Sequence, residues 1–198
     1  MPQDYVITVM SVDRVGIISD LSEAILELDG NICALSQTVV QGYFTVIVTA
    51  HFDDRLRADR ISEAVRSKGA SGELGVLVTQ RETGAAGPVV PGAQRFILTV
   101  TGADRKGIIQ RITSYLAARN INIEDLYATA LEGASFLLIA QIQVPEGREI
   151  ERLQMDVQEL WTEADVRVSL QHENIFLATS HVDFRQPPEA GGAGESGC

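Results

Sequence analysis

Asp13-Arg14-Val15-Gly16-Ile17-Ile18 occurs a second time, 91 residues later, as Asp104-Arg105-Lys106-Gly107-Ile108-Ile109. The same offset superimposes Asn31 on Asn122 and gives twelve identities over the 35 positions from Thr8 to Gly42. Unrelated segments share far fewer residues, so the two halves of the chain are copies of one unit. A fold derived for one copy therefore applies to both.

Each copy has the pattern of a βαββαβ unit. An apolar strand, Tyr5–Val12 in the first copy and Arg95–Thr101 in the second, leads into the glycine motif. Apolar residues at a spacing of about 3.6 follow the motif and predict an amphipathic helix. Two alternating stretches, a second amphipathic helix and a short strand complete the unit. The pattern predicts the α+β class, with two ferredoxin-like domains whose antiparallel sheets carry both helices on one face.

The two middle strands of each copy are expected to form a hairpin. They are joined at Gln41-Gly42 and at Glu132-Gly133, and a two-residue connection with glycine is typical of a β-hairpin. In the strand that follows, apolar residues alternate from Phe44 in the first copy and from Phe136 in the second. These two starting points are 92 residues apart, so the repeat slips by one residue here.

Glycine- and proline-rich segments set the expected domain boundaries. We expect a first domain over residues 1–81, a linker over 82–94, a second domain over 95–180 and a flexible tail over 181–198. A short added helix is expected after the last strand, at His172–Thr179. The face of each sheet without helices has apolar alternate residues. We therefore expect the two domains to pack on each other and the chain to form a homodimer.

Composition excludes several classes of function. Sixteen Lys and Arg against twenty-seven Asp and Glu give a net charge of −11, and both halves are acidic, so direct nucleic-acid binding is not expected. No apolar run reaches the length of a membrane span, and the N-terminus does not resemble a secretory signal. Cys33 and Cys198 do not suggest a disulfide framework, and a cytoplasmic protein is expected. No metal-ligand spacing and no catalytic motif is present, so neither an enzyme nor a cofactor is predicted.

The chemistry of the repeated motif suits an amino acid. Free N–H groups at the start of the first helix of each unit form an anion site, and glycine at positions 16 and 107 lets a carboxylate approach the backbone. Asp13 and Asp104 could hold an ammonium group, while Asn31 and Asn122 offer both a donor and an acceptor.

A purely structural interpretation of the same residues stays open. Asp13 could cap the helix, Gly16 could serve only a tight turn, and Asn31 could occupy a bend. Recurrence in the second copy does not decide between the two interpretations, because a turn that defines the fold would also be duplicated.

With D-R-x-G-I-I and a later N-I in each unit, the chain resembles tandem ACT domains. Two such units without a catalytic domain, ending in Gln-His-Glu-Asn-Ile-Phe, are most similar to the glycine cleavage system transcriptional repressor family. The resemblance implies an amino-acid site between domains, formed by the loop of one domain and the Asn of a neighbour. Carried over, it implies these ligand-binding residues: Asp13, Arg14, Gly16, Ile17 and Asn31, and Asp104, Arg105, Gly107, Ile108 and Asn122. The family often has Pro before the loop glycine, where this chain has Val15 and Lys106.

The resemblance implies a non-enzymatic protein that senses a small amino acid such as glycine or serine. It would modulate a protein partner such as a transcription activator, in the control of glycine or one-carbon metabolism. Two alternatives stay open. The chain could be a detached regulatory subunit of an enzyme of amino-acid or folate metabolism, similar to formyltetrahydrofolate deformylase, or a scaffold whose pockets have decayed.

Overall fold

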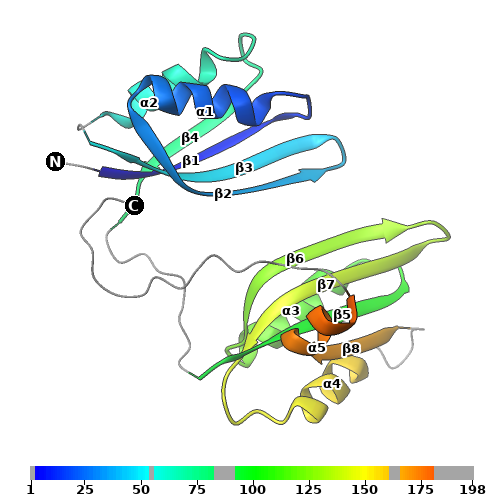
Figure 1. Ribbon diagram of the computed structural model, residues 1–198. Helices are drawn as coiled ribbons and strands as arrows, with labels where there is room; N and C mark the ends of the chain where they lie inside the picture. The colour runs from blue at the N-terminus through cyan, green and yellow to red at the C-terminus, as the bar shows by residue number, and fades with distance from the viewer. Residues whose placement is uncertain (1–2, 54–55, 83–91, 161–165, 181–198) are drawn as a thin grey trace. The chain divides into compact units, whose positions relative to one another are not determined.

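A computed structural model describes residues 3–53, 56–82, 92–160 and 166–180, with side chains described as far as residue 176 (Figure 1). The chain divides into two compact units, one built around β1–β4 and the other around β5–β8. Most of the expected linker and all of the expected tail, including Cys198, lie outside the described residues.

The first unit is a four-stranded antiparallel sheet in the order β2-β3-β1-β4. Its strands are β1 (Gln3–Val12), β2 (Gly30–Val40), β3 (Tyr43–Phe52) and β4 (Gly75–Gln80). Helices α1 (Ile17–Glu27) and α2 (Ala58–Arg66) cover one face of the sheet (Figure 1). This is the βαββαβ arrangement that the sequence predicts.

The second unit repeats the first with the order β6-β7-β5-β8. Its strands are β5 (Gln94–Ala103), β6 (Asn122–Leu131), β7 (Ser135–Val144) and β8 (Arg167–His172). Its helices are α3 (Ile108–Ala118), α4 (Ile150–Glu159) and an added α5 (Glu173–Ser180). The fold class is therefore confirmed as two ferredoxin-like units with antiparallel sheets.

The core of each unit lies between the sheet and its two helices. Alternate residues of the central strands, such as Ile7 and Val9 on β1, are fully buried, and so are Leu21 and Ile25 on α1. In the second unit, Leu98, Val100, Ile112 and Leu116 stand at the same positions and are also buried. Burial of one stripe per helix and one face per strand is what the apolar periodicity predicts.

The hairpins of the two units differ, and one expectation was wrong. Val40 pairs with Tyr43, so Gln41 and Gly42 form a two-residue turn; both have positive φ, which a type I′ turn requires. In the second unit Leu131 pairs with Ser135, so the connection has three residues, Glu132–Ala134, rather than two. The extra residue explains why the strand after the turn is displaced by 92 residues, whereas the rest of the repeat is displaced by 91.

The second face of the sheet is covered differently in the two units. In the second unit, α5 contacts β5 and β8, Gln141 on β7 donates to Glu173 of α5 at 3.2 Å, and Ile97 is buried on this face. In the first unit, the corresponding face exposes large apolar side chains from three strands: Met10, Val12, Tyr43, Ile47 and Leu77.

Candidate functional site

The first candidate element is the loop between β1 and α1, and its equivalent between β5 and α3. Gly16 and Gly107 occupy the N-cap positions of these helices with φ of 96° and 90°, and no side chain caps either helix. The interpretation of Asp13 as the helix cap is therefore wrong. The glycines are required by the backbone itself, because L-residues with a Cβ rarely adopt these φ values.

Space in front of the glycines is compatible with a bound ligand. A Cβ added at Gly107 would meet no heavy atom within 4 Å, and one added at Gly16 would meet only Arg14 Nη1, at 3.7 Å. Each loop is also tied to the hairpin turn of its own unit: the Asp13 N–H donates to the Gly42 carbonyl at 2.8 Å, and the Asp104 N–H to the Ala134 carbonyl at 2.7 Å. The loops are thus held in place by backbone contacts that leave the glycine side open.

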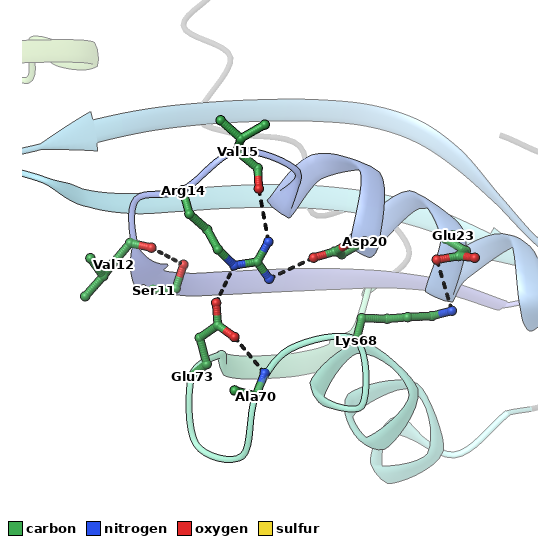
Figure 2. A network of polar contacts seen from close by, with 9 residues as sticks. All are labelled: Ser11, Val12, Arg14, Val15, Asp20, Glu23, Lys68, Ala70 and Glu73. Atoms are coloured by element: carbon green, nitrogen blue, oxygen red, sulfur yellow. Dashed lines mark hydrogen bonds and ion pairs between the residues drawn. The ribbon is translucent and has the colours of Figure 1, made fainter.

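Arg14 fixes the first loop to two other segments (Figure 2). Its Nη2 lies 2.8 Å from Asp20 Oδ2 on α1, and its Nε donates to Glu73 Oε1 in the connection between α2 and β4. Glu73 Oε2 in turn accepts the Ala70 N–H at 2.6 Å. The guanidinium that the resemblance assigns to ligand binding is therefore already held by two carboxylates.

These contacts shift the ionisation of the pair. The hydrogen bond from Arg14 and then that from the Ala70 N–H lower the pKa of Glu73 below its ordinary value. The hydrogen bonds to Glu73 and Asp20 raise the pKa of Arg14. The first loop is therefore locked by ionised groups at neutral pH.

The loop of the second unit lacks equivalent ion pairs among the described residues. Neither Arg105 nor Lys106 makes a side-chain hydrogen bond or ion pair with any residue in the described part of the chain, and both are exposed. The position of Asp20 in the first unit is taken here by Arg111, which cannot bind a guanidinium. A cavity of about 300 Å³ lies beside this region, lined by the end of β5, the β6–β7 turn and Arg167 of β8. In the described residues, Arg105, Lys106 and Arg167 thus lie near the second loop without a bound carboxylate, whereas Arg14 of the first loop is held by two.

Ile17 and Ile108, the other loop residues carried over from the resemblance, have buried side chains with exposed fractions of 2% and 4%. They belong to the cores of their units. Only their backbone N–H groups, at the first turn of α1 and α3, are placed to meet a ligand.

The two asparagines lie at the opposite end of the sheet from the loops. Asn31 pairs with His51, which pairs with Asp4 near the start of β1, whereas the loop follows Val12 at the end of β1. Eight residues of strand separate Asp4 from Val12, which is about 27 Å at 3.3–3.4 Å per residue. Asn122 and its loop are separated in the same way, because Asn122 pairs with Gln143 and the loop follows Ala103, which pairs with Ser135. Neither unit brings its own loop and Asn together.

Polar residues that sequence reasoning missed surround the asparagines. His51 Nδ1 lies 2.7 Å from Asp4 Oδ1 in the first unit. In the second unit, Glu124 accepts from Arg95 and from Gln143, while Gln143 Oε1 is buried and has no hydrogen-bond partner among the described residues. The period-two pattern of β3 and β7 predicts that His51 and Gln143 lie on the open face of their sheets. Their partners, Asp4 and Glu124, depend on strand register, which the pattern of a single sequence does not reveal.

Other kinds of site find no support in the described ranges. No three His, Cys, Asp or Glu side chains in this part of the chain gather as metal ligands. No helix there combines the length and apolar character that a membrane crossing requires.

The chain was compared with protein families and with solved structures. The family model described as the ACT domain matches residues 94–171. A UPF0237 protein of Methanosarcina acetivorans is 36% identical over 85 residues, which are 42% of this chain and 91% of the relative. The UPF0237 protein MK1213 of Methanopyrus kandleri is 36% identical over 89 residues, which are 44% of this chain and 98% of the relative.

Two solved structures cover both units. One is an unknown protein from Galdieria sulphuraria, with a TM-score of 0.69 and 23% identity over 87% of this chain and 99% of that one. The other is described as a "putative glycine cleavage system transcriptional repressor", with a TM-score of 0.62 and 18% identity over 87% of this chain and 99% of that one. At these identities the likeness shows a shared fold.

Two ferredoxin-like units, each with a glycine loop before its first helix, define a tandem arrangement of two small domains of one fold. The chain belongs to the ACT-domain family, which includes the UPF0237 proteins. ACT domains are regulatory, and they generally bind amino acids and often dimerise.

Proposed function

We propose that this chain is a non-enzymatic regulatory protein that binds a small amino acid at composite sites. Each site combines the loop of one ACT unit with the Asn-bearing sheet end of a neighbouring unit. The observation that carries the proposal is the separation of about 27 Å between loop and Asn within a unit, because only a neighbour can complete the site.

The chemistry of each half of the site fits one end of an amino acid. Backbone N–H groups after Gly16 or Gly107 receive the carboxylate, and Asp13 or Asp104 attracts the ammonium group. The Asn amide of the neighbour binds both ends of the ligand. In the second unit, the unpartnered Gln143 oxygen adds an acceptor for the ammonium group.

Strand geometry suggests how a neighbour is recruited. β2 and β6 are edge strands, and edge strands present free backbone groups that can pair with another strand. If two such strands pair antiparallel about a two-fold axis, the start of one lies beside the end of the other. Asn31 then meets the loop next to the partner's hairpin turn. The exposed apolar face of the first unit adds surface that an assembly would bury, and both features support a homodimer.

The proposed ligand and partner are taken by analogy from a protein that shares the fold. The shared fold of a protein described as a glycine cleavage repressor supports glycine or serine as the ligand and a protein such as a transcription activator as the partner, with this chain in the cytoplasm. The net charge of −11 supports control through that protein rather than through direct contact with nucleic acid.

A thermal-shift screen of the twenty amino acids identifies the ligand, since a ligand at 100 times its Kd stabilises the fold by about 2.7 kcal/mol. Calorimetry then follows on Asn31→Ala, Asn122→Ala and the double variant. Each Asn contacts a charged ligand group, so its loss costs about 1.5–3 kcal/mol, or roughly ten- to a hundredfold in Kd. Asn174→Ala, on exposed α5, is the matched control and binds as wild type does.

Two results would contradict the proposal. A folded double variant with unchanged affinity would show that the asparagines are structural. No response to any amino acid, together with co-purification of a catalytic subunit, would favour the detached regulatory subunit instead. Sedimentation of a monomer at tens of micromolar would remove the dimer from the proposal and leave only a site between the two units of one chain.

A further inference from the structure

A second cavity, of about 410 Å³, lies in the second unit away from the glycine loop. It is lined by the end of α3 and the start of α4, and among its lining residues are three arginines: Arg119, Arg148 and Arg152. Two carboxylates, Glu149 and Asp156, also line it, so the cavity has a net positive charge in a chain whose net charge is −11. Helices α3 and α4 lie on one face of the sheet (Figure 1).

Among the described residues, Arg119 is the one arginine of the cavity that pairs closely with a carboxylate. Asp156 Oδ2 accepts from the Tyr115 hydroxyl at 2.8 Å and lies 3.2 Å from Arg119 Nη2. The Arg119 guanidinium also lies 3.6 Å from the centre of the Tyr115 ring. Burial and then the bond to Asp156 raise the pKa of Tyr115 to about 12, so its hydroxyl stays a donor at neutral pH. Asp156 is thus neutralised by Arg119 and held in place by Tyr115.

The other two guanidinium groups remain available. Arg152 is 76% exposed and only its Nε approaches a carboxylate, at 4.0 Å from Asp156 Oδ1. Arg148 donates to the Arg119 carbonyl at 3.1 Å and makes no ion pair within the described ranges. Glu149 is exposed and forms no ion pair there either. Two arginine side chains therefore face a cavity without a carboxylate bound closely to either.

The first unit lacks most of these polar side chains at the equivalent positions between its two helices. By the offsets of 91 for α1 and 92 for α2, apolar residues occupy the equivalent positions: Ala24 for Tyr115, Leu28 for Arg119, Leu56 for Arg148 and Ala64 for Asp156. Ala24 is fully buried, and Leu28 and Leu56 pack against the core. These four positions are thus apolar in the first copy and polar in the second. In the second copy the side chains of Tyr115, Arg119 and Asp156 contact one another, and Arg148 donates to the Arg119 carbonyl. The position of Arg152 carries an arginine in both copies.

The fold alone does not explain this set of residues. In the first unit apolar residues stand at these positions, and α1 and α2 contact each other more extensively than α3 and α4 do. A single Arg–Asp pair would satisfy a buried polar contact. Arg148 bonds to the Arg119 carbonyl and Arg152 lies 4.0 Å from Asp156 Oδ1, but neither contact neutralises the added positive charge. A bound anion would therefore relieve the repulsion among the three arginines.

We propose that the cavity between α3 and α4 binds a small phosphorylated molecule through Arg148 and Arg152. A carboxylate has two oxygens, which one guanidinium fork can fill, whereas the terminal oxygens of a phosphate group can accept from two forks. The volume lies within the range of sites for small molecules. Arg119, Tyr115 and Asp156 position the wall of this site, which is distinct from the amino-acid site and does not depend on it.

The test is calorimetry on the full chain with inorganic pyrophosphate and with AMP, and with succinate as a carboxylate dianion. Arg148→Gln and Arg152→Gln are compared with Arg60→Gln, which removes the same charge at the position of Arg152 in the first unit. Each cavity variant is expected to weaken binding of pyrophosphate by about tenfold or more, the loss of a charge-assisted hydrogen bond, and Arg60→Gln to leave it within about twofold.

Three results would overturn this proposal: no binding of pyrophosphate or AMP at millimolar concentration, equal loss in Arg60→Gln, or equal binding of succinate. Arg148 and Arg152 are exposed and outside the core, so both variants should stay folded; only Arg148→Gln loses a hydrogen bond, to the Arg119 carbonyl, and should melt slightly earlier. The Asn31→Ala/Asn122→Ala double variant should still bind pyrophosphate, and this result would separate the cavity from the amino-acid site.

Discussion

Replacement of Gly107 by alanine tests whether the loop glycine serves the backbone or the ligand. Gly107 has a φ of 90°, and a Cβ placed there meets no heavy atom within 4 Å. The whole cost in the free protein is therefore the conformational one, about 1–2 kcal/mol for an L-residue in this region. For a unit of 60–100 residues, each kcal/mol lowers Tm by about 4–8 °C.

Urea and thermal unfolding of Gly107→Ala measure this cost, and two further variants isolate its origin. Asn tolerates positive φ better than Ala, so Gly107→Asn should lose less stability than Gly107→Ala. Gly147→Ala removes a glycine of φ 81° with equally open surroundings, outside the proposed amino-acid site. It should lose similar stability and keep its affinity for the amino acid.

The affinity of Gly107→Ala for the amino acid then tests whether the glycine also serves ligand binding. In Gly107→Ala the new methyl group stands where a carboxylate would approach the helix N–H groups, so amino-acid binding should weaken although the protein remains folded. A Gly107→Ala variant as stable as wild type, or an Asn variant less stable than the Ala variant, would refute the conformational argument. Unchanged affinity in a destabilised Ala variant would leave the glycine a purely structural role.

Two more outcomes follow from the first unit. Glu73→Gln removes a carboxylate whose pKa is lowered by Arg14. The stability that wild type gains over the variant should therefore be present above the ordinary pKa of 4.5 and disappear as pH falls through the lower pKa of the folded state. Acid titration followed by circular dichroism measures this difference, which is small because the ion pair is partly exposed. Gly30→Ala places a Cβ 2.3 Å from the Phe52 ring and 2.8 Å from Ile25, so it should cost about 1–3 kcal/mol or more by overpacking, and a wild-type Tm would contradict the register of β2 on β3.

The repeat and the apolar periodicity were enough to predict the fold, because both sheets and four of the five helices are built on residues that recur at fixed spacing. The one-residue slip at Phe136 was visible in the sequence, but the glycine at 133 favoured a two-residue turn. The third residue, Ala134, adopts a φ of 55°, which is uncommon for alanine and which no local pattern indicates.

The candidate site was less predictable, because its contacts are tertiary. Arg14 and Glu73 are 59 residues apart, and Glu73 stands in an irregular connection without periodicity. Asn31 lies at the far end of the sheet because β2 pairs antiparallel with β3. The Asn-Ile motif alone does not show whether the Asn lies near the loop or at the opposite end. Sequence patterns therefore proposed the residue types, and only strand register showed that one unit cannot bring its loop and its Asn together.

The differences between the two units point in one direction. Where the first unit binds its loop arginine to Asp20 and Glu73, the second leaves Arg105 and Lys106 without partners in the described residues. Where the first unit has Ala and Leu between its helices, the second has Arg148 and a partly buried Tyr115–Asp156 pair. In both places the second unit has basic side chains exposed to solvent where the first has contacts within its own fold. Under the proposals above, the second unit would hold anionic ligands through these basic groups, and an assembly would bury the exposed sheet face of the first unit.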